Sequence, residues 1–180
     1  DALLEQLERG LHRRAVREAG ARVDPEYYLS QCAAASSMDP KPSGWWSSYI
    51  CALTPAWDEF VLHVGTTYTT SEDGLWQPMT DARIKAVMPM APEGAWLFGE
   101  RGLAAVDRPT LIVDGSLDTI NPYLREAIFI FENLGSPDKT FVTFVNADHM
   151  LSLKPVPQWR LRHLAAAFGG RPLELVVGLG

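Results

Sequence analysis

A carboxylate and a histidine each follow one of two successive apolar runs in this sequence. Residues 110–113 lead through Gly115 to Asp118, and residues 141–145 lead to His149. If both runs are parallel strands, Asp118 and His149 lie in loops at the edge of the sheet where ligands bind in open α/β proteins. A carboxylate that accepts from one imidazole nitrogen leaves the other nitrogen as a proton acceptor. The pair could therefore take a proton from a serine or cysteine nucleophile.

Both residues also have ordinary structural explanations. Asp118 could cap the helix that follows it, and a single histidine in a loop is usually structural or solvated. The ordered pair, an acid after one strand and a histidine after the next, is much more specific than either residue alone. Asp148 is not expected to orient His149, because adjacent side chains in a loop tend to point apart.

Apolar side chains near this pair are candidates for an acyl pocket. Substrate contact is expected from Trp96, Ile120 and Met150, and Phe98 is a further candidate, although core packing explains each of them at least as well. Trp45 and Trp46 could form a hydrophobic mouth, or simply a small local core.

No metal or cofactor is expected. The other histidines, His12, His63 and His163, lie on presumed helices without a carboxylate or cysteine at a ligand spacing. No glycine-rich phosphate loop occurs.

Composition restricts the classes of partner. Of the 180 residues 47% are hydrophobic and 21% charged, as in a folded domain, and the formal net charge of -6 disfavours binding to nucleic acid. No run approaches the roughly 20 apolar residues of a transmembrane segment. A small uncharged substrate is the better expectation.

The two cysteines, Cys32 and Cys51, could form a disulfide. Closing a loop of about 20 residues would contribute roughly 3 kcal/mol, and a bonded pair would favour a secreted or periplasmic protein. Two unpaired thiols in a cytoplasmic enzyme are an equally good explanation.

Hydrophobic periodicity predicts an α/β fold. Helices are expected over 3–19, from Pro55 or Ala56 to Val64, and over 97–105, 122–134 and 158–168; buried strands are expected over 84–90, 110–113 and 141–145; the tail over 173–177 stays unassigned. Residues 21–54 contain Pro, Gly and Ser with large aromatics, a composition typical of turns. Strands alternating with helices indicate a parallel sheet with crossover helices.

Over residues 80–168 the sequence resembles the α/β-hydrolases, and within them dienelactone hydrolases and bacterial relatives of platelet-activating-factor acetylhydrolase. The resemblance rests on D-A-R-I-K-A-V-M-P-M-A-P, F-G-E-R-G-L-A-A-V, P-T-L-I-V-D-G-S-L-D-T-I-N-P, I-F-E-N-L-G-S-P-D-K and A-D-H-M. It implies that Asp118 is the triad acid and His149 the base. It also implies three parts: a helix over 1–20 after the nucleophile elbow, a mostly helical cap or lid over 21–80, and the C-terminal part of the core over 81–180.

One departure from the family pattern matters. No G-x-S-x-G motif occurs in these residues, and Gly115-Ser116-Leu117-Asp118 lacks its second glycine. We expect the serine to lie in an N-terminal part of the same enzyme, so this chain alone would be inactive. The predicted function is hydrolysis of a small-molecule or lipid-like ester, as in an esterase, lipase or lactonase. A non-catalytic binding module and a nucleotide-dependent α/β enzyme are the alternatives.

Overall fold

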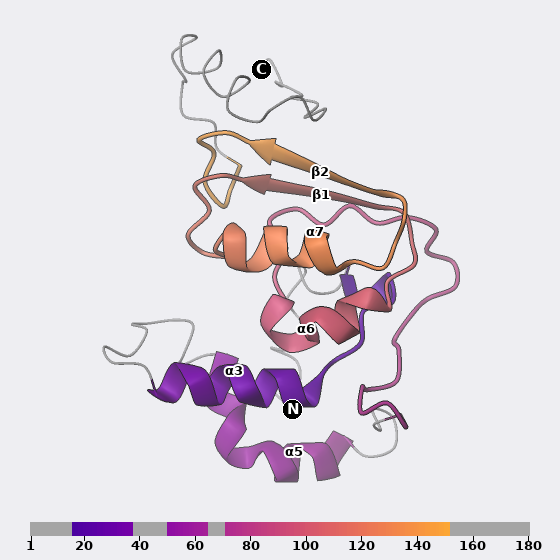
Figure 1. The fold of residues 1–180 in the computed structure, drawn as a ribbon, viewed down its shortest axis with the longest axis vertical. Helices are drawn as coiled ribbons and strands as arrows, with labels where there is room; N and C mark the ends of the chain where they lie inside the picture. The colour runs from indigo at the N-terminus through magenta and orange to yellow at the C-terminus, as the bar shows by residue number, and fades with distance from the viewer. Residues whose placement is uncertain (1–15, 38–49, 65–70, 152–180) are drawn as a thin grey trace.

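The computed structural model describes residues 16–37, 50–64 and 71–151. In chain order the elements are α3 (Pro25–Ser37), the 3-10 helix η1 (Ile50–Ala56), α5 (Trp57–Val64), α6 (Ala95–Ala104), β1 (Thr110–Gly115), the π-helical turn η3 (Leu124–Ile128), α7 (Phe129–Asn133) and β2 (Lys139–Phe144). The two strands lie on one side of α6 and α7, and α3 and α5 lie on the other (Figure 1).

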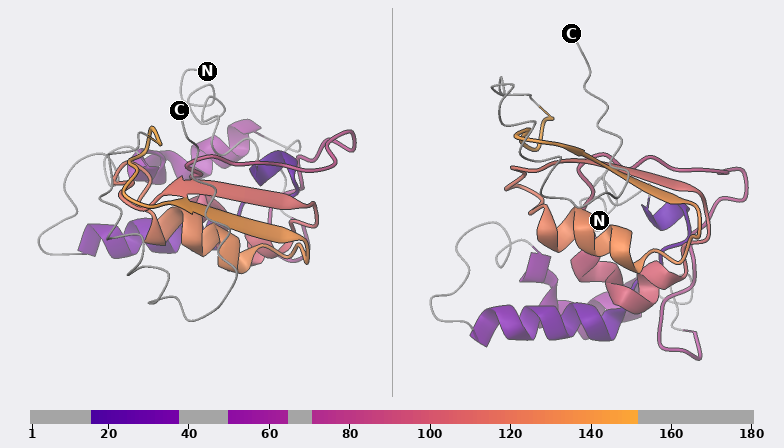
Figure 2. Two further views of the ribbon diagram at one scale, coloured as in Figure 1. Left: turned by 90° about the horizontal axis from the view of Figure 1, so that it is seen from above. Right: turned by 45° about the horizontal axis from the view of Figure 1, so that its top comes forward.

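The sheet consists of two parallel strands, and a further extended segment lies along the other edge of β1. β1 pairs with β2 in a register that sets Ile112 opposite Phe141, and the strands run side by side when seen from above (Figure 2). On the other edge of β1 an extended segment makes isolated parallel bridges, Val87 to Thr110 and Met90 to Val113. Flanked on both sides, β1 is almost entirely buried, which explains its continuous apolar run.

The strand expected over 84–90 is present only as this bridged segment. Its backbone makes ladder contacts, with Val113 N–H donating to Pro89 O at 3.0 Å and Ala91 N–H donating to Val113 O at 2.8 Å. Pro89 has no N–H of its own to donate, so the ladder is interrupted there. The expected α/β class is therefore confirmed in part: two parallel strands joined by a helical crossover, with a third extended segment alongside.

The helices after residue 90 agree with the predicted spacing. The helix expected over 122–134 is present as η3 followed by α7. The helix expected over 97–105 is present as α6, which is interrupted at Gly99, where φ is 56°. A Cβ there would lie 2.7 Å from the Tyr27 ring, so only glycine lets α6 approach α3 this closely.

The prediction of turns was wrong for residues 25–37, which form the 13-residue helix α3. The pair Asp24-Pro25 starts a helix here, with the Asp24 carboxylate accepting from Tyr27 N–H at 3.1 Å and Pro25 in the first helical position. Alanines later in α3 then favour its continuation. The helix expected to end at Val64 is confirmed, with α5 starting at Trp57.

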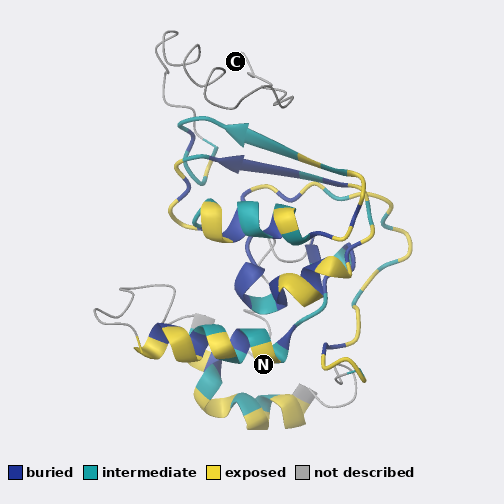
Figure 3. Cartoon of the chain, viewed as in Figure 1, coloured by how far each residue is buried: buried dark blue, intermediate teal, exposed yellow. Residues whose placement is uncertain are grey.

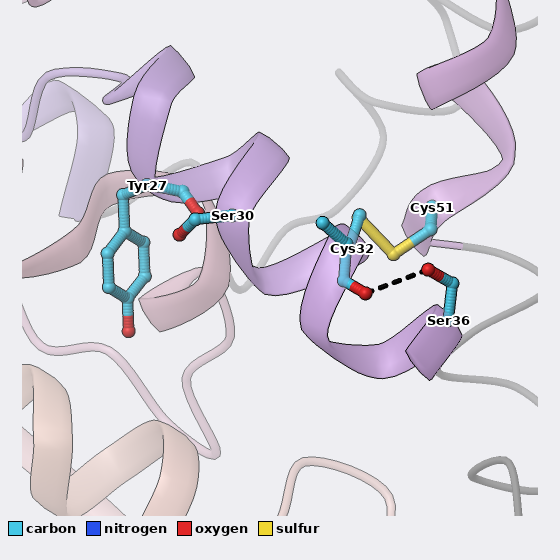
Figure 4. The surroundings of a disulfide bond; sticks show 6 residues. Tyr27, Ser30, Cys32, Ser36 and Cys51 are labelled. Atoms are coloured by element: carbon cyan, nitrogen blue, oxygen red, sulfur yellow. Dashed lines mark hydrogen bonds between the residues drawn. A yellow bond between two sulfur atoms is a disulfide. The ribbon is translucent and has the colours of Figure 1, made fainter. Parts of the chain in front are cut away.

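Two groups of buried side chains form the core. Buried residues are coloured dark blue in Figure 3. The larger one joins α6, β1 and α7 and includes Phe98, Leu103, Ile112 and Ile130. The smaller one, Tyr28, Cys32 and Trp96, lies between α3 and α6. A disulfide between Cys32 of α3 and Cys51 of η1, with Cα atoms 5.5 Å apart, fastens this second group (Figure 4).

Several predictions fall outside the described residues: most of the helix over 3–19, the helix over 158–168, the tail over 173–177, and the positions of Trp45 and Trp46. The division into residues 1–20, 21–80 and 81–180 stays a prediction. Within the described part of the chain, no helix combines the length and apolar character needed to cross a membrane.

Candidate active site

The Asp118 carboxylate and the His149 imidazole meet at the carboxyl end of the sheet. Asp118 Oδ2 lies 2.8 Å from His149 Nδ1, although the residues are 31 positions apart. The register pairs Gly115 with Phe144, so the loops that carry the two residues leave the strands at the same level. The Asp118 side chain is fully buried and that of His149 is 14% exposed. The contact is therefore shielded from water while the imidazole stays accessible.

The backbone of its own loop fixes the orientation of Asp118. Its Oδ1 accepts hydrogen bonds from Ile120 N–H and Asn121 N–H, each at 2.9 Å, which leaves Oδ2 for the histidine. The buried Asn121 side chain in turn donates to Ala91 O at 2.8 Å. The loop is thereby tied to the segment on the far side of β1, and the two N–H donors restrict the rotation of the carboxylate.

The loops after β1 and β2 are bonded to each other along their backbones. Leu117 N–H donates to Ala147 O at 2.9 Å, and Asn146 N–H donates to Ser116 Oγ at 2.8 Å. A Cβ on Gly115 would lie 2.5 Å from both the Ala147 and the Asp148 carbonyl oxygens. The close approach that brings His149 to Asp118 therefore requires glycine at position 115.

Unusual backbone conformations gather at the ends of these segments. Among the described residues, the non-glycine residues with positive φ are Ala91 (45°), Asn146 (65°) and Leu151 (54°). Ala91 ends the bridged segment, while Asn146 and Leu151 flank the loop that carries His149. Asparagine tolerates this conformation, whereas alanine and leucine adopt it at a cost that the surrounding contacts must offset.

This arrangement can perform acid–base chemistry. A carboxylate at Nδ1 stabilises the imidazole tautomer with its proton on Nδ1, so that Nε2 carries the lone pair, and it stabilises the imidazolium once Nε2 has taken a proton. The neighbouring Asp148 has a different role, because its Oδ1 accepts from Met150 N–H at 3.1 Å within a turn. The structure thus pairs His149 with the acid that the sequence indicated.

A second carboxyl group lies beneath the pair, at Asp114 near the end of β1. It is fully buried, and its Oδ1 accepts from Gly115 N–H at 2.7 Å. Burial, together with the adjacent Asp118 carboxylate, raises the pKa of Asp114 to about 7. Sequence reasoning missed this residue, and the available signal was a charged residue inside an otherwise apolar strand.

The predicted pocket residues divide into two groups. Ile120 and Met150 are exposed beside the pair, at 53% and 78%, and Leu117, which sequence reasoning missed, joins them at 47%. Trp96 lies elsewhere: it is buried against Tyr28 with ring centroids 5.7 Å apart, and its indole N–H donates to Glu93. Phe98 is fully buried in the larger core. Trp96 and Phe98 therefore belong to the hydrophobic core, in agreement with core packing, the alternative explanation given for both.

Among the described residues no three His, Cys, Asp or Glu side chains come together as a metal site would require. Of the histidines considered earlier, His63 is exposed on α5, and His12 and His163 lie outside the described residues.

Residues 71–158 match a protein family described as PETase: PET hydrolase-like. That family is related to the α/β-hydrolases, so the match confirms the resemblance to this superfamily found in the sequence. The closer similarity to dienelactone hydrolases and platelet-activating-factor acetylhydrolases stays a prediction. A search of curated proteins found no match.

Solved structures give partial alignments. A cold-adapted esterase from an Arctic intertidal metagenomic library aligns at 21% identity over 49% of this chain and 38% of its own, with a TM-score of 0.34. Its zinc-bound form aligns at 16% identity over 81% and 57%, with a TM-score of 0.32. A Paleococcus ferrophilus monoacylglycerol lipase aligns at 17% identity over 82% and 52%, with a TM-score of 0.28. This chain thus spans well under two thirds of each protein.

Proposed function

We propose that this chain supplies the acid and the base of a serine hydrolase that cleaves carboxylic esters. The observation that carries the proposal is the 2.8 Å contact between Asp118 and His149 at the ends of neighbouring parallel strands. The match to a PET hydrolase-like family supports an ester as the bond that is cleaved.

In this mechanism the nucleophile is a serine from outside these 180 residues, because the sequence contains no G-x-S-x-G motif. His149 Nε2 takes the serine proton as the oxygen attacks the acyl carbon, and then returns that proton to the departing alcohol. Water, activated by the same nitrogen, resolves the acyl-enzyme. Asp118 holds the imidazole in place and stabilises the imidazolium at each step.

The side chains around the pair support an uncharged acyl group as the substrate. Leu117, Ile120 and Met150 are exposed apolar side chains in the loops that carry Asp118 and His149. An apolar acyl chain that covers these side chains gains roughly 25 cal/mol for each Å² removed from water, whereas a charged group would lose hydration there.

The test is fluorophosphonate labelling and activated-ester hydrolysis by the complete protein that carries this chain. We expect His149→Ala to abolish labelling, and Asp118→Asn to lower kcat by about 10³- to 10⁴-fold because the imidazole loses its orientation. His63→Ala is the matched control, since His63 is an exposed histidine on α5 remote from both loops in the sequence.

The outcomes separate the competing functions. Labelling of a serine in wild type and in His63→Ala, but not in His149→Ala, supports the hydrolase. If no serine is labelled in the complete protein, the proposal fails and a binding module becomes the better explanation. Equal activity of wild type and Asp118→Asn would remove Asp118 from the mechanism.

A further inference from the structure

The Asp114 carboxyl group is buried without the donors that a carboxylate requires. Asp114 lies next to last in β1, opposite Thr143 of β2, and no part of it reaches solvent. Oδ1 accepts from Gly115 N–H at 2.7 Å, but Oδ2 has no hydrogen-bond partner among the described residues. An ionised carboxylate placed in this way would lose most of its hydration without replacement.

The polar group that interacts with Asp114 is the Asp118 carboxyl. Asp118 already accepts three hydrogen bonds, two from its own loop and one from His149, and is therefore the group that carries the negative charge. Two carboxyl groups attract each other only when one of them holds a proton. A proton on Asp114 lets its buried carboxyl group donate a hydrogen bond, and the Asp118 carboxylate accepts that bond.

Other polar groups of the described residues near Asp114 are already engaged with each other. The Thr143 hydroxyl on β2 is bonded to the Tyr123 hydroxyl at 2.7 Å. Burial raises the pKa of Tyr123, and the charge on Asp114 adds to the effect, so Tyr123 stays neutral. On the opposite edge of β1, residues 87–91 bring only apolar side chains. In the part of the chain that the structure describes, the titratable groups that interact with Asp114 are thus Asp118 and Tyr123, with His149 reached through Asp118.

We propose that Asp114 is a positioning residue for the acid–base pair: its protonated carboxyl O–H donates a hydrogen bond to the Asp118 carboxylate and so keeps that carboxylate aimed at His149. The inference rests on the proposed function for its catalytic meaning, but the carboxyl pair can be tested separately from any activity.

Ionisation of Asp114 changes this arrangement. Once Asp114 loses its proton, two carboxylates face each other and the donor to Asp118 is lost. The burial-raised pKa of Asp114, about 7, sets this transition near neutral pH. We expect activity to decline above neutral pH as Asp118 loses this donor, whereas a histidine base by itself loses activity only on the acid side.

The first experiment needs no substitution. Aspartate carboxyl carbons are labelled with ¹³C in the wild-type protein, and their NMR shifts are followed with pH. We expect one aspartate carboxyl to titrate near pH 7, far above the ordinary range of about 3 to 5. If every aspartate titrates within that ordinary range, the proposal is overturned whatever the enzyme does.

Two variants then separate positioning from packing. Asp114→Asn keeps a donor toward Asp118 without ionising, and Asp114→Leu fills the site but offers no donor. We expect both variants to fold and the near-neutral carboxyl titration to disappear in both, because neither carries the Asp114 carboxyl.

Hydrolysis by the complete protein gives the last readout. Asp114→Leu should lose at least about tenfold in kcat with KM little changed, because a misplaced base weakens the transition state more than substrate binding. Asp114→Asn should recover most of that loss and lack the added alkaline decline. Equal kcat values and pH profiles in wild type and Asp114→Leu would refute the positioning role of Asp114. If the wild-type protein shows no hydrolysis, only the proposed function is refuted.

Discussion

At the scale of single residues, the site depends on a few atoms held by backbone groups. Asp118 is oriented by two N–H donors, and His149 reaches it because the loops after β1 and β2 are bonded to each other. Small changes in those loops should therefore affect chemistry more than substitutions of comparable size on the surface.

Gly115→Ala tests the contact between the two loops. The new Cβ would lie 2.5 Å from the carbonyl oxygens of Ala147 and Asp148, so the segment next to His149 must shift. We expect a loss of about 1–3 kcal/mol in the free energy of unfolding and displaced NMR signals of the His149 ring. Gly74→Ala is the control: φ there is 82°, so it costs stability, but its added Cβ meets only Arg101, and the His149 ring signals should stay as in wild type.

Ile120→Ala and Met150→Ala test the apolar surface beside the pair. Each variant removes apolar atoms that an acyl chain would cover. KM for long-chain esters should therefore rise by about fourfold for each methylene removed from the side chain, and KM for acetate esters should change less. Leu62→Ala, which truncates a leucine that is 82% exposed on α5, should leave both unchanged. An equal effect on short and long esters would count against an acyl-binding role.

At the scale of elements, a buried carboxyl group organises the start of α6. Glu126 of η3 accepts from Gly94 N–H at 2.8 Å and Ala95 N–H at 2.9 Å, so the crossover helix satisfies donors that the first turn of α6 cannot pair internally. Burial raises the pKa of Glu126 to about 8 from its ordinary value of 4.5, although the two N–H donors act in the opposite direction.

The raised pKa predicts how stability depends on pH. The folded state holds the Glu126 proton more tightly than the unfolded state, so this contribution is complete below pH 4.5 and is lost as the pH rises through about 8. We expect the melting temperature of Glu126→Gln to fall less between about pH 5 and about pH 9 than that of wild type. An unchanged pH dependence would show that Glu126 does not titrate in this range.

Glu126→Ala isolates the hydrogen bonds from the charge. It leaves the N–H groups of Gly94 and Ala95 buried without an acceptor, which should cost about 1–3 kcal/mol more in unfolding free energy than Glu126→Gln. Chemical denaturation of the two variants measures this difference. Equal stabilities would mean that another group accepts these donors.

At the scale of the whole molecule, the disulfide adds a covalent link between α3 and η1, which also share hydrophobic contacts. Cys32 lies in α3 and Cys51 in η1, 19 positions later. We expect the double variant Cys32→Ser/Cys51→Ser to lose about 3 kcal/mol, because the unfolded chain regains the entropy of the open loop. The melting temperature of wild type under reducing conditions should match that of the variant, and the variant itself should not respond to reductant.

The absence of a nucleophile motif gives a prediction for the chain by itself. The 180 residues contain an acid and a base but no G-x-S-x-G, so the purified chain should not hydrolyse activated esters above the background rate. Hydrolysis by this chain that disappears in His149→Ala would mean that a serine within these residues acts as the nucleophile.

The sequence predicted the periodic parts of the fold and the pairing of Asp118 with His149. The strands over 110–113 and 141–145 and the helix over 122–134 could be predicted because apolar spacing reports burial directly. Residues 25–37 were misread, since Asp-Pro starts both turns and helices, and the packing of α3 on α6 decides between them. The strand predicted over 84–90 is present only as a bridged segment, because Pro89 has no N–H to donate to the ladder.

Only the tertiary structure decided which polar groups meet. Spacing along the chain placed Asp118 and His149 at one sheet edge, but their 2.8 Å contact depends on Gly115, which lets two loops 30 residues apart touch. The burial of Asp114 and Glu126 was equally hidden, because whether a carboxyl loses water depends on neighbours from other elements. Trp96 was assigned to the pocket for the same reason: sequence reports that a side chain is apolar, and packing determines what it faces.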